Sequence, residues 1–462
     1  MKKHYKYLVL LAIIGIGTVS CDSILEPSVD QAVPTDQAVK SASDLASLIN
    51  GAHDIMNGAG FLGEDAIGTP EVMSDNAFSN TNSGRYATQS LASYVATDGY
   101  SSTQWATAYQ VIAQANIVLS SDLSGSNVDY YKGQAYALRA YMHMYLLLNF
   151  GQQFVEGGDP NLGIPYVTTY AEGNIYPSRE PISTVFEKIE QDFDQAVNLM
   201  NPSLDGSSSL IGYYATQGLM SRFFLYTGEF SKAIAAADVV INSGQYSVVS
   251  EDNFVTTWQS TTSPGIIYEL AFTATDRNGF ENLARMMRPT NYGDIEVTKD
   301  LFDSYSDTDV RKQLIVEAPV GRYRMMHKYN LEDGTDNIAL LRFAEVWLNK
   351  AEALARSGQN ATALEMINTL STARGATNSY TTGSVSEVLA ERRLELALEG
   401  HRFFDLARHG LDIPNPPIPS ALAPNRFNSN ASPIPYGDKV YALPIPQNEM
   451  DSNPSMVQNK GY

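Results

Sequence analysis

Three long segments of the chain repeat apolar side chains at intervals of three and four residues. This interval places the side chains on one face of an α-helix, and that face is buried when the helix packs. The second segment ends at a glycine and the third has a proline near its first turn, as helices commonly do. The segments are STQWATAYQVIAQANIVLSS, KGQAYALRAYMHMYLLLNFG and EPISTVFEKIEQDFDQAVNLM. The spacing therefore predicts a mainly α fold.

Two later segments resemble each other and predict paired helices. Each has a glycine that is followed five residues later by an alanine, at Gly228 with Ala233 and at Gly358 with Ala363. Small residues allow two antiparallel helices to approach closely, and the pattern is typical of a tetratricopeptide-like hairpin. Because the two glycines are 130 positions apart, the hairpins do not form a continuous array. We expect a large insertion between them.

Two regions lack this periodicity and are rich in turn-forming residues. They span about residues 58–102 and 245–332, and the second contains GIIYELAF, which reads as a short strand. Long loops within a helical scaffold are commonly functional. We therefore predict a scaffold of tetratricopeptide-like helical hairpins with long irregular loops and a few short strands. We expect the ligand-binding loops in these two regions.

The first residues have the organisation of a secretory signal. A lysine-rich start precedes the apolar residues 8–16, and the small residues TVS lead into Cys21, the only cysteine of the chain. This arrangement resembles a bacterial lipobox, in which the thiol becomes a thioether to diacylglycerol; a simple secretory signal is the alternative. We expect residues 1–20 to be removed as a lipoprotein signal peptide and Cys21 to carry the lipid anchor. Residues 21–34 are expected to form a tether and residues 35–462 a single domain.

Charge and motifs argue against several classes of function. The formal net charge is −20, and removal of residues 1–20 takes away three lysines and leaves −23. Such an acidic chain repels phosphate backbones, so we expect no nucleic acid as a partner. The six histidines form no zinc motif, and no nucleophile elbow or phosphate-binding glycine loop occurs, so we expect no metal and no cofactor. Paired carboxylates for glycoside hydrolysis stay open, because a sequence does not reveal their separation.

A family resemblance covers nearly the whole mature chain. The segments ERRLELALEGHRFFDLARHG and VYALPIPQNEMDSNPSMVQNKGY resemble the C-terminal signature and the closing segment of SusD/RagB outer-membrane lipoproteins. Further pieces agree in order: WATAYQVIAQAN, ALRAYMHMYLLLNFG followed by GIPYV, VFEKIEQDFDQAV, YTGEFSKAIAAADVVINSGQYSVV and LLRFAEVWLNKAEAL. The loops depart from the family, since the region before Trp105 is short and has no tryptophan of its own.

The resemblance implies a SusD-like fold and a non-enzymatic, cell-surface carbohydrate-binding protein. Such a protein captures an oligosaccharide and delivers it to a SusC-like TonB-dependent transporter of the outer membrane. The resemblance also implies a lipid-anchored protein at the outer membrane that faces the cell exterior. Two alternatives stay open: an anchored glycoside hydrolase, and a peptide-binding member of the same family, which charged rather than aromatic pocket residues would favour.

The C-terminal signature is predicted to be structural. Ser384 and Glu387 have the spacing of a capping box, and the charged residues of the signature lie three or four positions apart, so that they can pair. Arg393 and Glu395 are expected in a buried or half-buried charge cluster. The two histidines of the signature are expected to pack or cap, because no cysteine or second histidine completes a metal site.

The candidate ligand-binding residues come from the two long loops. Sugar capture requires aromatic faces against C–H surfaces, and amide, carboxylate or guanidinium groups against hydroxyls. The candidates are Asn76, Phe78, Arg85 and Tyr86 in the first loop, and Trp258, Arg277, Phe280, Asn291 and Tyr292 in the second. Tyr86 and Tyr292 are preferred because a phenol stacks and hydrogen-bonds at once, whereas Phe78 and Trp258 can equally anchor a loop. We expect Trp105, Leu301 and Phe302 to pack on helices instead.

Overall fold

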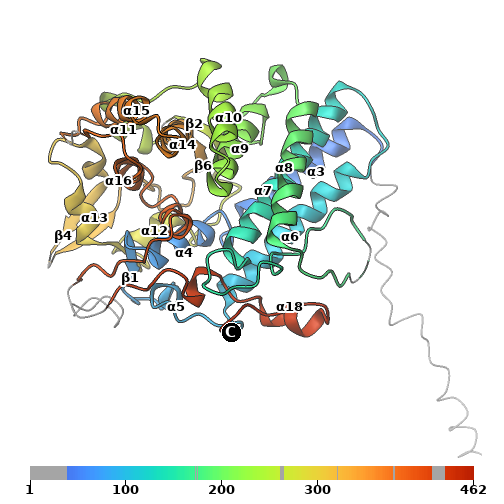
Figure 1. Cartoon of the computed structure of the whole chain (residues 1–462), viewed down its shortest axis with the longest axis horizontal. Helices are drawn as coiled ribbons and strands as arrows, with labels where there is room; N and C mark the ends of the chain where they lie inside the picture. Colours follow the sequence, from blue (N-terminus) through green and yellow to red (C-terminus); the bar gives the residue numbers. More distant parts are fainter. Residues whose placement is uncertain are drawn as a thin grey trace, which may run out of the picture. The chain divides into compact units, whose positions relative to one another are not determined.

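The computed structural model describes residues 39–171, 173, 175–260, 265–319, 321–377, 380–418 and 432–462 (Figure 1). The signal peptide, Cys21 and the tether that the sequence predicts lie outside the described residues. Contacts divide the chain into two units, Met1–Lys40 and Ser41–Tyr462. The architecture given below is that of the second unit.

Long helices form the scaffold, and the mainly α prediction is confirmed. The three periodic segments form α6, α7 and α8. Asp98 caps α6 by accepting a hydrogen bond from the backbone N–H of Tyr100. Helix α7 is followed by Gly151, and α8 is preceded by Pro181. The long helices are α3 (Ala42–Asn57), α6 (Gly99–Leu119), α7 (Ser126–Phe150), α8 (Ile182–Leu199), α9 (Tyr213–Thr227), α10 (Phe230–Asn242), α14 (Phe343–Arg356) and α15 (Asn360–Thr372).

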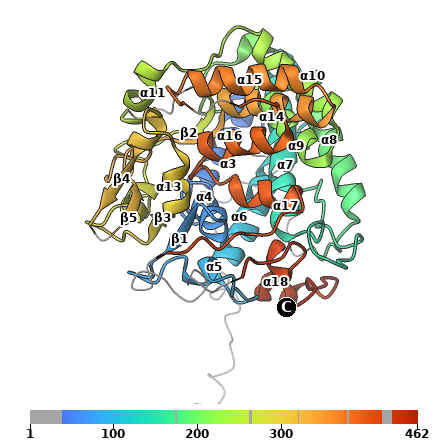
Figure 2. The same cartoon turned by 60° about the vertical axis from the view of Figure 1, so that its left-hand side comes forward.

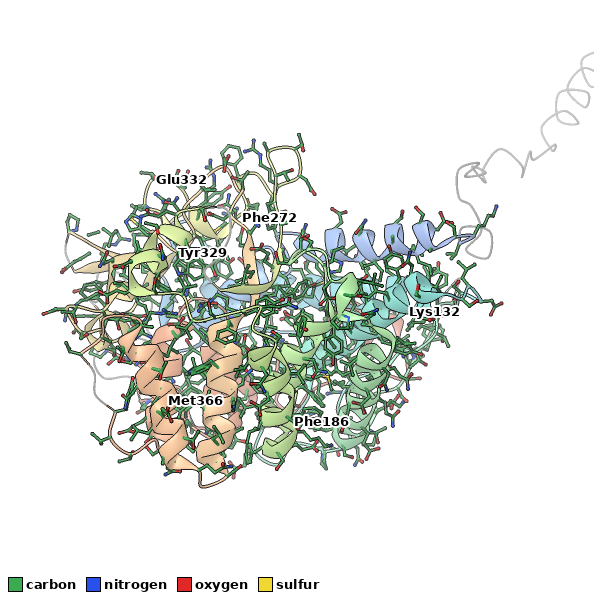
Figure 3. The ribbon with its side chains drawn as sticks, turned by 90° about the horizontal axis from the view of Figure 1, so that it is seen from above. Lys132, Phe186, Phe272, Tyr329, Glu332 and Met366 are labelled. Carbon is green, nitrogen blue, oxygen red and sulfur yellow. The ribbon has the colours of Figure 1, made fainter. Side chains whose placement is uncertain are left out.

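The predicted hairpins are α9 with α10 and α14 with α15. Gly228 and Gly358 stand between the paired helices with φ of +81° and +78°, a left-handed conformation that glycine adopts without steric cost. Ala233 and Ala363 are completely buried where the helices of each pair meet. Helix α10 also packs on α14, so the two hairpins are neighbours in space although 130 positions separate their turns. Figure 3 shows this row of helices, with Phe186 on α8 and Met366 on α15.

Shorter elements lie in the two predicted loop regions and in the C-terminal part of the chain. The short helices are α4 (Asp65–Met73), α5 (Ala87–Ser90), α11 (Glu251–Trp258), α12 (Leu283–Met287), α13 (Lys299–Ser304), α16 (Val385–Glu395), α17 (Arg402–Arg408) and α18 (Gln447–Ser452), with 3-10 turns η2 (Pro202–Leu204), η3 (Val310–Leu314) and η5 (Lys439–Tyr441). The strands are β1 (Ala77–Ser79), β2 (Ile266–Leu270), β3 (Ile295–Val297), β4 (Ile315–Ala318), β5 (Arg322–Met325) and β6 (Ile338–Arg342). The predicted strand in GIIYELAF is β2, and the few short strands that the sequence predicts are present.

A four-stranded antiparallel sheet joins the two loop regions. Its strand order is β1-β3-β5-β4, and in the first pair Ala77 lies opposite Val297 while Ser79 lies opposite Ile295. Figure 2 shows this sheet at the side of the molecule away from α8 and α9. Strands β2 and β6 form a second antiparallel pair, and β6 continues directly into α14. The sheet thereby fixes the first loop region against the second.

Several charged residues of the C-terminal signature pair with distant elements, although Asp405 pairs with Arg392 and Arg408 of the same signature. Glu395 of α16 accepts hydrogen bonds from Arg342 at 2.9 Å and from Arg374 at 2.9 Å, and all three side chains are buried. Burial alone would raise the pKa of Glu395, but the two guanidinium groups outweigh burial and hold that pKa well below its ordinary value. Arg393 forms a separate set of ion pairs, with Asp75 and Asp300. Both residues therefore lie in charge clusters, Glu395 in a buried one and Arg393 in another.

The capping box is only half formed. The Ser384 hydroxyl accepts from the backbone N–H of Glu387, as expected of an N-cap, but the Glu387 carboxylate accepts from the N–H groups of Thr382 and Gly383 instead of that of Ser384. Burial lowers the pKa of His401 to about 4, which keeps this imidazole neutral at physiological pH. The other signature histidine, His409, contacts the Glu352 carboxylate at 2.7 Å.

No helix of the described part of the chain is both long enough and apolar enough to cross a membrane.

Candidate functional site

Four of the nine predicted ligand-binding residues lie in the core. Asn76, Phe78, Tyr86 and Trp258 are 0 %, 2 %, 0 % and 2 % exposed. The Asn76 amide donates to Glu71 and accepts from Arg393, and the Trp258 ring packs beneath the Lys328 ammonium at 4.8 Å. These side chains hold the loops on the scaffold, so none of them offers a ligand a surface in this conformation.

Four of the other five candidates gather on one surface with their neighbours. The Arg85 guanidinium lies 3.7 Å from the centroid of the Tyr292 ring, and the Tyr292 hydroxyl donates to Glu281 at 3.1 Å. Beside them, Asn291 accepts from Arg285 at 2.7 Å, and the same guanidinium lies over the Phe280 ring at 4.2 Å. We call this the loop surface, and its members are Arg85, Phe280, Glu281, Arg285, Asn291 and Tyr292.

Phe280 and Arg277 show how the loop surface meets solvent. Phe280 is the most exposed large apolar side chain of the described residues, at 65 %. Arg277 forms a more exposed ion pair with Asp333, and the neighbouring Glu332 accepts from the Asn291 amide at 2.6 Å. Figure 3 shows Glu332 at the edge opposite the helices that carry Phe186 and Met366. The loop surface is therefore an accessible face built from both loop regions, outside the helical hairpins.

Polar contacts that continue the β1–β3 pairing bring Arg85 to Tyr292. Beyond the strands, the Asn82 amide donates to the Tyr292 carbonyl at 2.7 Å, and the Ser83 N–H donates to Asp294 at 2.7 Å. Tyr86 has a left-handed backbone with φ of +56°, which is strained for a residue with a large side chain. Its N–H donates to the Tyr100 hydroxyl at 3.1 Å, and its buried side chain fixes this conformation.

An open cavity of about 510 Å³ adjoins the loop surface and shares Arg85 and Glu281 with it. We call it the polar cavity; its ionisable lining residues are Glu64, Asp65, Arg85, Asp98, Tyr100 and Glu281. Arg85 donates to both carboxylate oxygens of Glu281, at 2.7 and 3.3 Å, and this pair separates the cavity from the Tyr292 ring. A ligand can therefore contact the aromatic loop surface and the acidic cavity together.

Two adjacent carboxyl groups lie at the start of α4 in the polar cavity. Glu64 is the residue before the helix and Asp65 its first residue, and the Tyr86 hydroxyl lies 2.9 Å from an oxygen of each. Gly68 leaves room for this hydroxyl, because a Cβ there would lie 3.0 Å from the Tyr86 ring. Burial raises the pKa of Asp65 to about 7, and burial together with the negative charge of Asp65 raises the pKa of Glu64 well above its ordinary value.

The sequence analysis did not single out these two acids or Glu281. The available signal is the Glu64-Asp65 doublet directly after the glycine-rich GAGFLG, inside the first predicted loop region. Their importance depends on Tyr86 and Arg85 reaching them across the fold, which no local pattern reveals. No group of three or more His, Cys, Asp or Glu side chains that could hold a metal ion occurs among the described residues.

A second hollow, of about 320 Å³, lies between α6, residues 165–171, 173 and 175–177, and α18. Its walls are mainly apolar and include Trp105, Tyr109, Tyr170 and Ile175, and Glu449 is the one acidic side chain among its described lining residues. Trp105 is 4 % exposed and donates to Glu449 at 3.3 Å, in line with the expected packing role. The polar cavity has the denser set of hydrogen-bonding groups, so we take it and the loop surface as the candidate site.

Two family models match the chain. The model described as "SusD family" matches residues 320–462, and the model described as "Starch-binding associating with outer membrane" matches residues 24–225. A SusD-like protein of Formosa agariphila is 26 % identical over 87 % of this chain and 90 % of its own length. The starch-binding protein SusD of Bacteroides thetaiotaomicron is 33 % identical, over 27 % of this chain and 22 % of its own.

Solved structures agree with the family models. A crystal structure from Bacteroides vulgatus superimposes with a TM-score of 0.83 at 26 % identity, covering 92 % of this chain and 99 % of the other. The two matched regions contain the C-terminal charge cluster and the scaffold helices α6, α7 and α8 respectively. With its hairpin scaffold and C-terminal signature, the chain belongs to the SusD/RagB family.

Proposed function

We propose that this chain is a non-enzymatic, lipid-anchored protein of the outer membrane that captures an oligosaccharide outside the cell. It then delivers the oligosaccharide to a SusC-like TonB-dependent transporter. The observation that carries the proposal is the loop surface, where the Tyr292 and Phe280 rings lie beside guanidinium, amide and carboxylate groups. Aromatic faces bind the C–H surfaces of sugars, and the charged and amide groups bind hydroxyls. The names of the matched model and of the starch-binding relative support the same ligand class.

A gel experiment tests capture against hydrolysis. The purified protein is run through native gels that contain one soluble glycan each, from a panel of starch, laminarin, xylan and mannan. Retardation in at least one glycan, with no shortening of that glycan on prolonged incubation, is the expected result. Shortening of the chains would assign the protein to the glycoside hydrolases, and retardation by none of a broad panel would contradict glycan capture.

Replacing Tyr292 with alanine is expected to weaken glycan binding several-fold. Loss of an aromatic platform costs about 0.5–1.5 kcal/mol beyond the lost contact area. The ring is half-buried, so we expect the melting temperature to change little. Calorimetry with the retarded glycan measures the affinity. Tyr176→Ala is the matched control, because Tyr176 is 50 % exposed outside the loop surface. Wild-type affinity in Tyr292→Ala would show that the ligand binds elsewhere.

Replacing Cys21 with alanine is expected to release the protein from membranes. Cys21 is the only side chain of the sequence that can form the thioether to diacylglycerol. Two or more acyl chains anchor a protein stably, and no other anchor is proposed. Partitioning between detergent and aqueous phases after a high-salt wash measures the change. A Cys21→Ala protein that stays in the detergent phase would contradict the lipoprotein assignment.

A further inference from the structure

The polar cavity contains more negative charge than its one guanidinium can balance. Among its described lining residues, the carboxyl groups are Glu64, Asp65, Asp98 and Glu281, and the only cation is Arg85. Arg85 already forms a bidentate ion pair with Glu281. Both oxygens of Asp98 accept hydrogen bonds from neutral donors, namely Thr88, Gln89 and the N–H of Tyr100. Glu64 and Asp65 have no paired cation, and the donor that their side chains share is the Tyr86 hydroxyl.

The Glu64 carboxyl is buried and incompletely bonded. The residue is 2 % exposed, and its Oε2 atom has no hydrogen-bond partner among the described residues. Its other oxygen contacts Tyr86 at 2.9 Å, and its charge interacts with Glu281 and Arg85, which line the same cavity. A buried acceptor without a donor costs stability, and protein structures contain few of them. We therefore infer that a hydrogen-bond donor of the ligand binds this oxygen.

The geometry around Tyr86 shows what kind of donor is missing. The Tyr86 hydroxyl has one proton, yet it lies 2.9 Å from an oxygen of Glu64 and from an oxygen of Asp65. One of the two contacts therefore needs a proton from a carboxyl group. Without ligand, the Glu64 and Asp65 carboxyl groups together retain one proton. A ligand cation can take over the role of that proton. A hydroxyl supplies one donor and no charge, whereas an ammonium supplies three donors and a positive charge.

We propose that the polar cavity recognises an oligosaccharide with a free amino group, such as a 2-amino sugar without its acetyl group, and that Glu64 and Asp65 bind the ammonium. The inference rests on the proposed glycan capture and names the class of glycan. The sugar rings lie on the Tyr292 side of the Arg85–Glu281 pair, and the ammonium enters the cavity. On binding, the proton held by the carboxyl pair is released to solvent or passes to an uncharged amine. No bond other than to that proton is broken.

Two trisaccharides with the same backbone test this inference. The full-length protein is titrated at pH 6 with tri-glucosamine and with tri-N-acetylglucosamine, and the ratio of the two affinities is measured. We expect the amino form to bind about tenfold tighter or more, because hydrogen bonds between charged groups are the stronger ones. Glu64→Gln and Asp65→Asn should each reduce the ratio to near one while the melting transition stays cooperative.

Glu365→Gln is the matched control, because Glu365 is an exposed acid on α15 and its removal changes the net charge by the same amount. It should leave the affinity ratio unchanged. The same loss of ratio in Glu365→Gln would reveal general attraction of a polycation to an acidic protein and would overturn the inference. Equal affinities, a preference for the N-acetyl form, or tighter binding of tri-lysine than of tri-glucosamine would also overturn it.

The two proposals fail in different ways. If neither trisaccharide binds but a neutral glycan does, and Tyr292→Ala weakens that binding, the amino-sugar inference is wrong and glycan capture stands. If no glycan binds, both are wrong.

Discussion

Replacing Glu395 with alanine is expected to lower the free energy of unfolding by about 3–5 kcal/mol. Glu395 is 1 % exposed and its carboxylate bonds Arg342 and Arg374 and lies 3.3 Å from Arg311. Its removal leaves guanidinium groups in the core with too little negative charge around them, which is the costly way to break a buried ion pair. Chemical denaturation, followed by circular dichroism, measures the change.

The control for Glu395→Ala is Glu365→Ala, which removes an exposed carboxylate from α15 and should change stability by no more than about 0.5 kcal/mol. The affinity of the folded Glu395→Ala protein for its glycan should equal that of the wild type, because α16 does not line the polar cavity. Unchanged stability combined with lost binding would mean that the C-terminal signature is itself a ligand site.

The helices could be predicted because each repeats its pattern over many residues. α6, α7 and α8 are 21, 25 and 18 residues long, so several turns of apolar spacing lie in each. Strands β1 and β3 have three residues each and are buried throughout, which leaves no alternation to detect. Their pairing joins residue 77 to residue 297, and no local signal carries such a contact. The sheet could not be foreseen for that reason.

The candidate site was predicted by region better than by residue. Composition located the two loop regions, and Arg85 and Tyr292 lie in contact on the loop surface. Tyr86 is next to Arg85 in sequence, but its left-handed backbone turns the side chain inward, so its hydroxyl serves the carboxyl pair. A loop aromatic has the same composition whether it anchors the loop or contacts a ligand. Burial separates the two roles, and burial depends on the whole fold.

The ion-pair partners of the C-terminal signature also could not be predicted from local spacing. Residues three or four apart in a helix can pair with each other, but Glu391 pairs with Arg311 and Arg392 pairs with Asp405. Each of these four side chains is buried. The cluster therefore ties α16 to η3 and α17, and its role is visible only once those elements are placed.

Replacing Asp65 with asparagine is expected to stabilise the ligand-free protein at pH 8 and much less at pH 4.5. Burial raises the pKa of Asp65 from 3.8 to about 7 in the folded protein. Between pH 3.8 and about pH 7, Asp65 is protonated in the folded state and ionised in the unfolded state. The wild type therefore loses stability as the pH rises through this range, and loses no further stability from Asp65 above about pH 7. Asparagine has no proton to lose. The stabilisation by Asp65→Asn should therefore grow from pH 4.5 to pH 7 and then level off.

Several neighbouring groups decide how large this effect is. The groups that influence Asp65 are Glu64, Arg85, Tyr86, Asp98, Tyr100 and Glu281. The full pKa difference corresponds to about 4 kcal/mol, but Asp65 is only partly buried and shares one proton with Glu64, so we expect roughly 2–3 kcal/mol. Urea denaturation at each pH measures the difference between the variant and the wild type, with Glu365→Gln as a control that should show no such growth. If the stabilisation by Asp65→Asn does not increase with pH, ionised Asp65 does not destabilise the folded protein. If it does increase, the wild type keeps Asp65 at a cost in stability, as expected of a binding site for a cation.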